Sequence, residues 1–455
     1  MKSIKTLFLA GSSTLILSAC ISTGNFTSIV SQTPEEWVAY ESSILKNSNA
    51  KDLQNWWTGF DDKTLNELVE LTLNQSPDRK IAEQRIQEAR GLKRTTRSFL
   101  LPQIGASANI GEEDNGLTDD NFYDAGFDAS FEIDVFGENR NALNAADSRL
   151  SALEAQYHDV SLTLISEVVS TYIDILESNK QVMIAEENLE IQQKTLELIT
   201  QQRDVGETPQ LDVERSQALV NTTQASITNF QRLADNAQLR LTVLTGELPQ
   251  SIQIILSEGY DPLLLENIEP VLLAPADVLN VRPDVKAASL FLKERTSLRQ
   301  SAFASLFPSF SVSGFFGVAE TALTSSTNIW NIALGTAVSL IDFGRIEGQI
   351  DAARARENIA FETYRKTILE AIVEVETALN DYARIQEQYE SLNLAFQNSK
   401  NAFQLSEQLY REGETSFIDL LDAQRTLNDS QSALVTAEAS KAQAAIRIYK
   451  SLGIY

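Results

Sequence analysis

The sequence has few of the side chains on which most enzyme sites and metal centres depend. Its 455 residues include one cysteine, Cys20, and one histidine, His158. Zinc and iron sites therefore lack their usual ligands, so we predict no metal site. A single cysteine also excludes an intramolecular disulfide bond. His158 lies in a helical stretch beside Tyr157, where a position on the helix surface is a better interpretation than a catalytic one. With no nucleotide-binding loop and no repeated carboxylate pair, the chain is predicted not to be an enzyme.

Positive charge is also scarce. The chain has 37 lysine and arginine residues against 63 aspartate and glutamate residues, which gives a net charge of −26. Such acidity argues against nucleic acid and anionic lipid as partners. It is compatible with a solvated acidic surface or with a lumen that attracts cations.

The N-terminus, MKSIKTLFLAGSSTLILSAC, has two early lysines, a short apolar run and small residues before a cysteine. This pattern is typical of a secretory signal, and the run is too short and too interrupted to predict a membrane span. An ordinary signal peptide that ends near a cysteine is one interpretation. We favour a bacterial lipobox, L-S-A-C, with a signal peptide at 1–19, a covalent lipid on Cys20 and a lipidated N-terminal extension at 20–59. The residue after the cysteine is Ile21 rather than Asp, which by the usual sorting rule for such lipoproteins points to the outer membrane.

The chain also contains an internal repeat. VGETPQLDVERSQALVN at 205–221 has a counterpart 207 positions later, EGETSFIDLLDAQRTLN at 412–428. The same offset continues to the C-terminus, and an offset of 206 aligns 76–103 with 282–309. We predict two copies of one unit. The predicted domains are repeat 1 at 60–249, a linker or equatorial segment at 250–274, and repeat 2 at 275–455.

Each unit is predicted to begin with a helix and to continue with two strands. Pro77-Asp78 and Pro283-Asp284 suit a first helical turn, because proline is tolerated there and a carboxylate favours the positive end of the helix dipole. We expect these helices to end near Pro102 and Pro308. Apolar residues then alternate with small or polar ones, which indicates strands. The alternating segments are 126–137, 309–318 and 331–341, with an acidic connector predicted at 111–121 and a Ser/Thr-rich connector at 321–328.

Helical periodicity returns after Gly137 and Gly344 and lasts until the two Gly-Glu-Thr turns. A helix over 138–203 would be on the order of 100 Å long at 1.5 Å per residue, which no compact domain needs. Aromatic residues recur at the heptad spacing of coiled coils in the second unit. These residues are Tyr382, Tyr389, Phe396, Phe403 and Tyr410. We therefore predict a long helical hairpin in each unit, closed by Gly206 or Gly413.

Four strands with one apolar face cannot form a stable isolated sheet in water, because their edges and their apolar face need partners. In a membrane only a closed barrel satisfies every main-chain group of a strand, and closure takes about eight strands or more. Several chains must then contribute, and three chains would supply twelve strands. The fold is predicted to be mainly α with a β part, in which helical hairpins continue a barrel.

Several motifs follow one another along nearly the whole mature chain. They are WWTGFDDKTLNELV (56–69), SPDRKIAEQRIQEAR (76–90), FEIDVFG (131–137), RPDVKAA (282–288), IDFGR (341–345), the two GET turns and LLDAQR (420–425). Together they resemble the TolC-like outer membrane factor family, in its lipoprotein branch of multidrug efflux outer membrane channels. The resemblance implies a homotrimer with a long α-helical barrel, a 12-strand outer-membrane β-barrel and an equatorial belt. It also implies a passive exit duct for an inner-membrane pump of the resistance-nodulation-division type, joined through a periplasmic adaptor (membrane fusion) protein.

The resemblance also assigns a periplasmic gate. In the family, helix ends that carry aspartates pinch the tube, and the matching residues are Asp419 and Asp422, three apart on one helical face. Asp419 is also explained as a first-turn acid at a helix N-terminus, and both interpretations stay open. Asp422 has Arg215 at the equivalent place in repeat 1, which favours a gate role. Tyr410 and Arg425 match gate-bracing positions of some relatives, whereas a basic latch residue of other relatives is replaced by Thr415.

The hairpin turns match the surface on which the family binds its adaptor. We expect the docking residues to be Arg203, Gly206, Glu207, Asp212, Arg411, Gly413 and Glu414. A simple helix-to-helix turn would explain the glycines but not the repeated Arg and Asp that flank them.

Two other functions remain as alternatives. A duct for type I protein secretion would share the architecture, although the lipobox favours efflux. A structural coiled-coil lipoprotein would explain the long helices but has no use for the alternating strands.

Overall fold

The computed structural model describes residues 37–38, 54–114, 119–257, 273–321 and 324–454. The predicted signal peptide, Cys20 and most of the predicted N-terminal extension lie outside the described residues. The chain divides into two compact units, Met1–Thr33 and Pro34–Tyr455, and every described residue belongs to the second.

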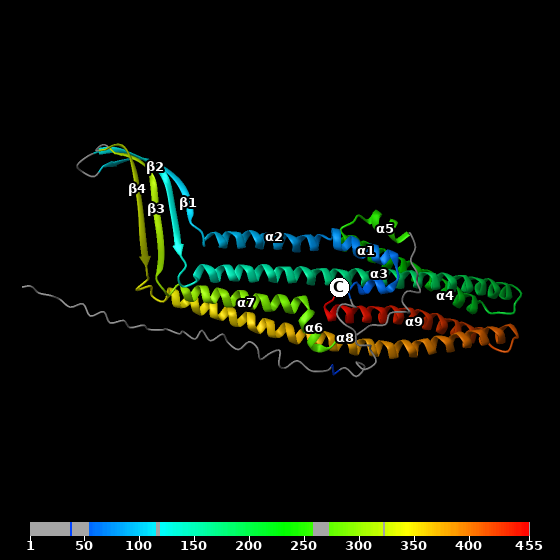
Figure 1. Cartoon of the computed structure of the whole chain (residues 1–455). Helices are drawn as coiled ribbons and strands as arrows, with labels where there is room; N and C mark the ends of the chain where they lie inside the picture. Colours follow the sequence, from blue (N-terminus) through cyan, green and yellow to red (C-terminus); the bar gives the residue numbers. More distant parts are fainter. Residues whose placement is uncertain (1–36, 39–53, 115–118, 258–272, 322–323, 455) are drawn as a thin grey trace, which may run out of the picture. The chain divides into compact units, whose positions relative to one another are not determined.

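Two long helical hairpins form most of this unit. Helices α3 (Glu138–Asp204) and α4 (Gln210–Thr245) make the first, and α8 (Arg345–Arg411) and α9 (Phe417–Leu452) make the second. α3 and α8 each have 67 residues, and α4 and α9 each have 36. The hairpins pack together through α3 and α9, and both turns lie at the same end (Figure 1). The predicted helical hairpins are confirmed, and α3 ends one residue beyond the predicted Arg203.

Each of the two longest helices begins at a glycine with a left-handed backbone. Gly137 has φ +82° and Gly344 has φ +84°, a region that glycine enters without steric cost. An aspartate just upstream accepts hydrogen bonds from the first-turn N–H groups, which have no partner inside the helix. Asp134 accepts from the Arg140 N–H at 2.8 Å, and Asp342 accepts from the Ile346 N–H at 3.0 Å.

Helices α2 (Pro77–Ser98) and α7 (Pro283–Ala304) pack along α3, and each has 22 residues. Their proline starts are as predicted, but they end at Ser98 and Ala304, four residues before Pro102 and Pro308. Residues before a proline are disfavoured in helical conformation, so the chain leaves each helix through a tight turn first. The shorter helices are η4 (Trp56–Phe60), α1 (Lys63–Gln75), α5 (Pro249–Ser257) and α6 (Pro275–Val281).

The strands form one antiparallel sheet in the order β1-β2-β3-β4. They span Gln103–Asp114, Asp119–Ile133, Ser309–Thr321 and Thr324–Ala337. The predicted connectors at 111–121 and 321–328 were wrong, because most of those residues pair within the sheet. Runs of acidic and hydroxyl residues resemble a loop in composition, although the main-chain ladder continues through them. The predicted end of the last strand at 341 was also wrong, since β4 ends at Ala337.

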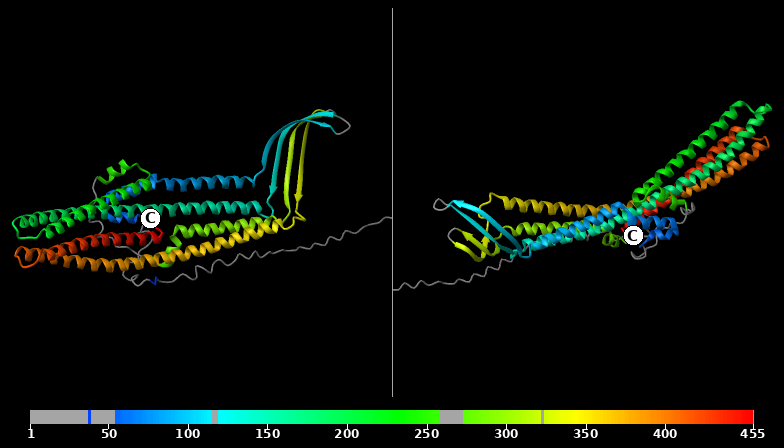
Figure 2. Two further views of the ribbon diagram at one scale, coloured as in Figure 1. Left: turned by 180° about the vertical axis from the view of Figure 1, so that it is seen from behind. Right: turned by 90° about the horizontal axis from the view of Figure 1, so that it is seen from above.

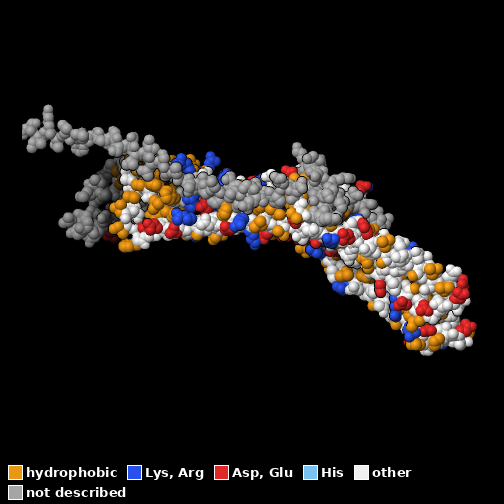
Figure 3. All heavy atoms as spheres, turned by 90° about the horizontal axis from the view of Figure 1, so that it is seen from below, with side chains coloured by type: hydrophobic (Ala, Val, Ile, Leu, Met, Phe, Trp, Pro, Cys, Tyr) orange, Lys and Arg blue, Asp and Glu red, His pale blue; other side chains and the backbone are white. Residues whose placement is uncertain are grey.

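One face of the sheet is apolar and uncovered. The cross-strand row Phe127, Phe316 and Trp330 is 62%, 63% and 73% exposed. The opposite face is polar, where Asn109 donates to Asp124 Oδ2 at 2.9 Å. Figure 2 shows the four strands from two further sides, and Figure 3 shows hydrophobic side chains gathered at the strand end of one face. β1 and β4 are open edges within the single chain.

The main core lies where the hairpins meet the short helices. Trp56 of η4 stacks on Tyr449 of α9, with ring centroids 4.9 Å apart. Tyr172 of α3 is 1% exposed and donates its hydroxyl to Asp62 Oδ2 at 2.7 Å. Asp62 also caps α1 by accepting from the Leu65 N–H at 3.0 Å. Side chains from η4, α1, α3, α4, α5 and α9 therefore meet in one cluster. No helix among the described residues is both long and apolar enough to cross a membrane.

A buried arginine connects the start of repeat 2 with its end. Arg282, 6% exposed, donates from Nη1 to the Ser451 carbonyl oxygen at 2.7 Å. Its Nη2 lies 2.7 Å from carboxylate oxygens of both Asp284 and Glu374. Gly453 allows this contact, since a Cβ there would lie 2.5 Å from Arg282 Cγ. The RPDV motif therefore connects α7, α8 and the end of α9.

We expect Arg282→Met to destabilise the protein by about 2 to 3 kcal/mol, because it leaves a buried carbonyl oxygen and two carboxylates without their partner. The midpoint of chemical unfolding, followed by circular dichroism, measures this loss. Arg384→Met is the matched control, since Arg384 pairs with Glu387 on the surface, where such a pair contributes little. Equal midpoints for the two variants would contradict the expectation.

Candidate gate and docking site at the hairpin tips

The two Gly-Glu-Thr turns have the same main-chain structure. Gly206 has φ +86° and Gly413 has φ +76°, so each provides the left-handed residue that ends a helix. In each turn the glutamate N–H donates to a carbonyl oxygen five residues back at 2.9 Å, Glu207 to Gln202 and Glu414 to Leu409. A Cβ on either glycine would meet no atom within 4 Å, so conformation alone requires glycine there.

The charged residues around the first turn form contacts within their own hairpin. Arg203 Nη1 donates to Gln210 Oε1 at 2.8 Å, and Nη2 lies 2.7 Å from Asp204. Asp212 lies 3.3 Å from Arg215 one turn further along α4. Glu207 is exposed. The predicted docking residues of this hairpin are thus grouped at one surface, with the arginine oriented by its neighbours.

The second turn has a similar arrangement. Arg411 pairs with Glu407 at 2.7 Å, and Glu414 is exposed. Red acidic side chains gather at the hairpin end of the face drawn in Figure 3. The two tips together present a polar surface with exposed carboxylates.

Asp419 lies in the first turn of α9 and belongs to a capping box. It accepts from the Ser416 N–H at 3.2 Å and from the Thr415 hydroxyl at 2.9 Å, while its own N–H donates to Ser416 Oγ at 3.4 Å. The Ser416 and Thr415 hydroxyls and the Ser416 N–H hold the pKa of Asp419 below its ordinary value. These contacts give Asp419 the geometry of a helix-end acid, and its gate role remains a proposal.

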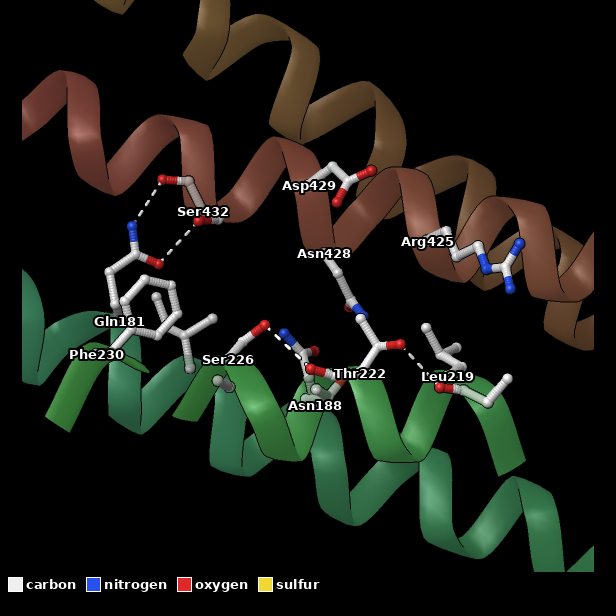
Figure 4. A pocket seen from close by; sticks show the side chains of 14 residues that line it. Gln181, Asn188, Leu219, Thr222, Ser226, Phe230, Arg425, Asn428, Asp429 and Ser432 are labelled. Carbon is white, nitrogen blue, oxygen red and sulfur yellow. Dashed lines mark hydrogen bonds between the residues drawn. The ribbon is translucent and has the colours of Figure 1, made fainter. Parts of the chain in front are cut away.

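Asp422 and Arg425 lie further along α9 and are both exposed. Among the described residues, neither side chain has a hydrogen-bond or ion-pair partner. Arg425 lines a groove of about 390 Å³ between α3, α4 and α9. Figure 4 shows this groove, with Asn428 directed from α9 toward α4. The structure therefore places Arg425 away from the capping box, and Asp422 between the two.

Tyr410 connects the two hairpins near their tips. Its hydroxyl donates to Gln202 Oε1 of α3 at 2.9 Å, and its ring contacts Phe417 edge-on with centroids 5.9 Å apart. Burial and the negative charge of Asp212 raise the pKa of Tyr410. The ring also packs against an apolar cluster that includes Ile199. Tyr410 thus stabilises contact between α8 and α3 within one chain.

The sequence interpretation missed two residues of this site. Ser416 could have been found, because Ser-x-x-Asp before an apolar run is the signal of a capping box. Gln202 carries no local signal, because its partner is 208 positions away. No group of three or more His, Cys, Asp or Glu side chains in the described part of the chain is arranged to hold a metal ion.

The capping box makes the start of α9 sensitive to pH. The pKa of Asp419 is lower in the folded chain than its ordinary value of 3.8, so its contribution is present above that value and is lost as the pH falls below it. We expect the Ser416 and Asp419 amides to lose hydrogen-exchange protection over that range, and Asp419→Asn to weaken this response. The start of α4 is the internal control, because Pro209 makes no side-chain cap bond. An equal loss at both helix starts would contradict the assignment.

Comparison with known proteins places this geometry. The model of the family described as outer membrane efflux protein matches residues 68–247 and 274–454. The pyoverdine export outer membrane protein OpmQ of Pseudomonas aeruginosa is 29% identical over 99% of this chain and 97% of its own. The cation efflux system protein CusC of Escherichia coli is 25% identical over 96% of both chains. The solved structure of the outer-membrane channel OprN has a TM-score of 0.82 and 31% identity, covering 93% of this chain and 97% of that one.

These matches confirm the resemblance to TolC-like channels, the prediction of an efflux channel of the outer membrane, and the prediction that the protein is not an enzyme. The matched segments together cover most of the chain. The chain therefore belongs to the outer membrane efflux protein family.

Proposed function

We propose that three copies of this chain form a passive exit duct through the outer membrane. In the duct, a 12-strand β-barrel continues into an α-helical barrel in the periplasm. Small molecules enter at the hairpin tips, delivered by an inner-membrane pump of the resistance-nodulation-division type through a periplasmic adaptor.

The observation that carries this proposal is the open sheet. Both edge strands have unpaired main-chain groups, and the row Phe127, Phe316 and Trp330 is exposed on one face. Lipid would cover the apolar face, and neighbouring copies would pair β1 with β4 and close the edges. Four strands from each of three chains supply twelve, which exceeds the minimum of about eight. A coiled-coil rod leaves both the edges and the apolar face unexplained.

The hairpin tips would then meet around the axis of the tube. Asp422 is exposed and has no partner among the described residues, so three copies would form a ring of carboxylates that repel one another and attract cations. Tyr410 would oppose opening through its bond to Gln202. Asp419 would add a second acidic ring while it caps α9.

The adaptor would bind at the two Gly-Glu-Thr turns. Their equal main-chain structure gives each chain two similar sites, and a trimer would present six. Arg203 and Arg411 lie within four residues of the exposed Glu207 and Glu414 along the chain, so each turn offers both charge signs to a polar partner.

We further propose that a lipid on Cys20 anchors the chain to the outer membrane. The cargo class follows the relatives, one of which is named for pyoverdine export and another for cation efflux. The acidic tips favour neutral or cationic molecules over anions at the entrance. Among the relatives compared, none is named for protein secretion, so small-molecule efflux is preferred to a type I secretion duct.

The particle mass in detergent and the conductance in planar bilayers test the duct. We expect a trimer that conducts weakly, because the tips are closed, and Asp422→Ala to raise the conductance several-fold by removing the acidic ring. Asp235→Ala on the exposed surface of α4 is the matched control and should leave the conductance unchanged. A non-conducting monomer would instead favour the structural coiled-coil lipoprotein. A conducting trimer that does not respond to Asp422→Ala would remove only the gate assignment.

A further inference from the structure

The two hairpins meet along a seam that is polar over much of its length. Lys180 Nζ of α3 lies 2.7 Å from Glu438 Oε2 of α9, and both side chains are nearly buried. Gln181 Nε2 donates to the Ser432 carbonyl oxygen at 2.9 Å, while Ser432 Oγ donates to Gln181 Oε1 at 2.9 Å. Figure 4 shows this reciprocal pair beside the groove. In this part of the seam the buried polar groups are satisfied.

Closer to the tips the same seam loses its hydrogen bonds. Asn188 Nδ2 is 3.4 Å from Gln431 Oε1, which is a long contact. One turn further along α3, Gln192 is 1% exposed, and neither its amide nitrogen nor its amide oxygen has a partner among the residues that the structure describes. The buried Asn428 Oδ1 on α9 has no partner among these residues either.

Gln192 lies on the same face of α3 as residues that contact α9. Gln181, Asn188, Gln192 and Ile199 are spaced by seven, four and seven residues, so they lie along one face of the helix. Gln181 bonds to α9, and Ile199 packs with Leu420 of α9 in the apolar cluster at the tips. Gln192 is therefore buried between a segment whose polar groups are satisfied and an apolar segment, at a position where its amide makes no hydrogen bond.

We propose that Gln192, together with Asn428, sets the balance between the closed and open states of the hairpin tips. A buried amide without partners destabilises the state in which it is buried. Separation of α9 from α3 below Asn188 would expose both amides to water and satisfy them. The apolar cluster and the Tyr410 to Gln202 bond favour the closed state instead. This inference rests on the proposed gate and adds two residues whose unsatisfied amides oppose its closed state.

The opposing contributions lie within the same seam, which makes its equilibrium adjustable. A partner that binds the open tips needs only a modest difference in affinity between the two states, because the closed state already contains unsatisfied groups. A wholly apolar seam would need a much larger difference. The amide of Gln192 thus affects the gate indirectly, by destabilising the contact between α3 and α9.

The test replaces Gln192 with a side chain of similar shape that needs no hydrogen bonds. Gln192→Met in the conducting Asp422→Ala background should lower the open fraction by about tenfold, the usual effect of removing one unsatisfied buried group. Gln181→Met is the matched control on the same helix face, and it should raise the open fraction because Ser432 loses both of its contacts with the side chain. Hydrogen exchange of 185–199 and 420–431 in the full-length trimer gives a readout that is independent of conduction. Exchange there should slow in Gln192→Met and quicken in Gln181→Met.

Opposite signs for the two variants support the proposal. If Gln192→Met raises the open fraction or quickens exchange as Gln181→Met does, the Gln192 amide is satisfied in solution and the proposal is overturned. If Gln192→Met slows exchange while the protein does not conduct in any form, the amide destabilises the closed seam as proposed, and the exit-duct function fails instead.

Discussion

Main-chain hydrogen bonding in the sheet constrains every other part of this protein. A main-chain N–H or C=O group without a partner costs several kcal/mol in hydrocarbon, and both edge strands of the four-stranded sheet have such groups. The exposed apolar face of the same sheet makes water an equally poor surrounding. Closing the sheet with other copies would pair the edge strands, and lipid around the closed sheet would cover the apolar face. Because α2, α3, α7 and α8 adjoin the strands in the chain, the closed sheet would also fix where the helical hairpins stand.

The hairpins differ from the sheet in how firmly they are held. Near the sheet and in the middle, α3 packs against α2 and α7 and contributes to the main apolar core. Toward the tips, α3 meets α9 through amide, hydroxyl and carboxylate groups, and then through a small apolar cluster. Polar contacts can be exchanged for water at low cost, whereas a packed core cannot. The tips are therefore the part of the helices in which movement costs least, as the proposed entrance would require.

Local patterns predicted the candidate site only in part. Gly206 and Gly413 were recognisable because a left-handed turn residue between two helical stretches favours glycine. Asp419 was recognisable as a first-turn acid, although its bonds to Ser416 were overlooked. The contact between Tyr410 and Gln202 could not be derived, because it depends on how two hairpins pack whose contacting residues are 208 positions apart. The strand boundaries were wrong for a different reason, since runs of acidic and hydroxyl residues have the composition of a loop although they pair within the sheet.

The sequence by itself determined the repeat pattern, the two long helical hairpins and the alternation of the strands, because these follow from periodicity and from the turn residues. Tertiary structure alone decided which polar groups are satisfied. Gln181 and Gln192 lie on the same face of α3 and are the same residue type, yet one bonds to Ser432 and the other is buried without a partner in the described chain. That difference arises from the register between α3 and α9, and register is a property of two packed helices rather than of either helix alone.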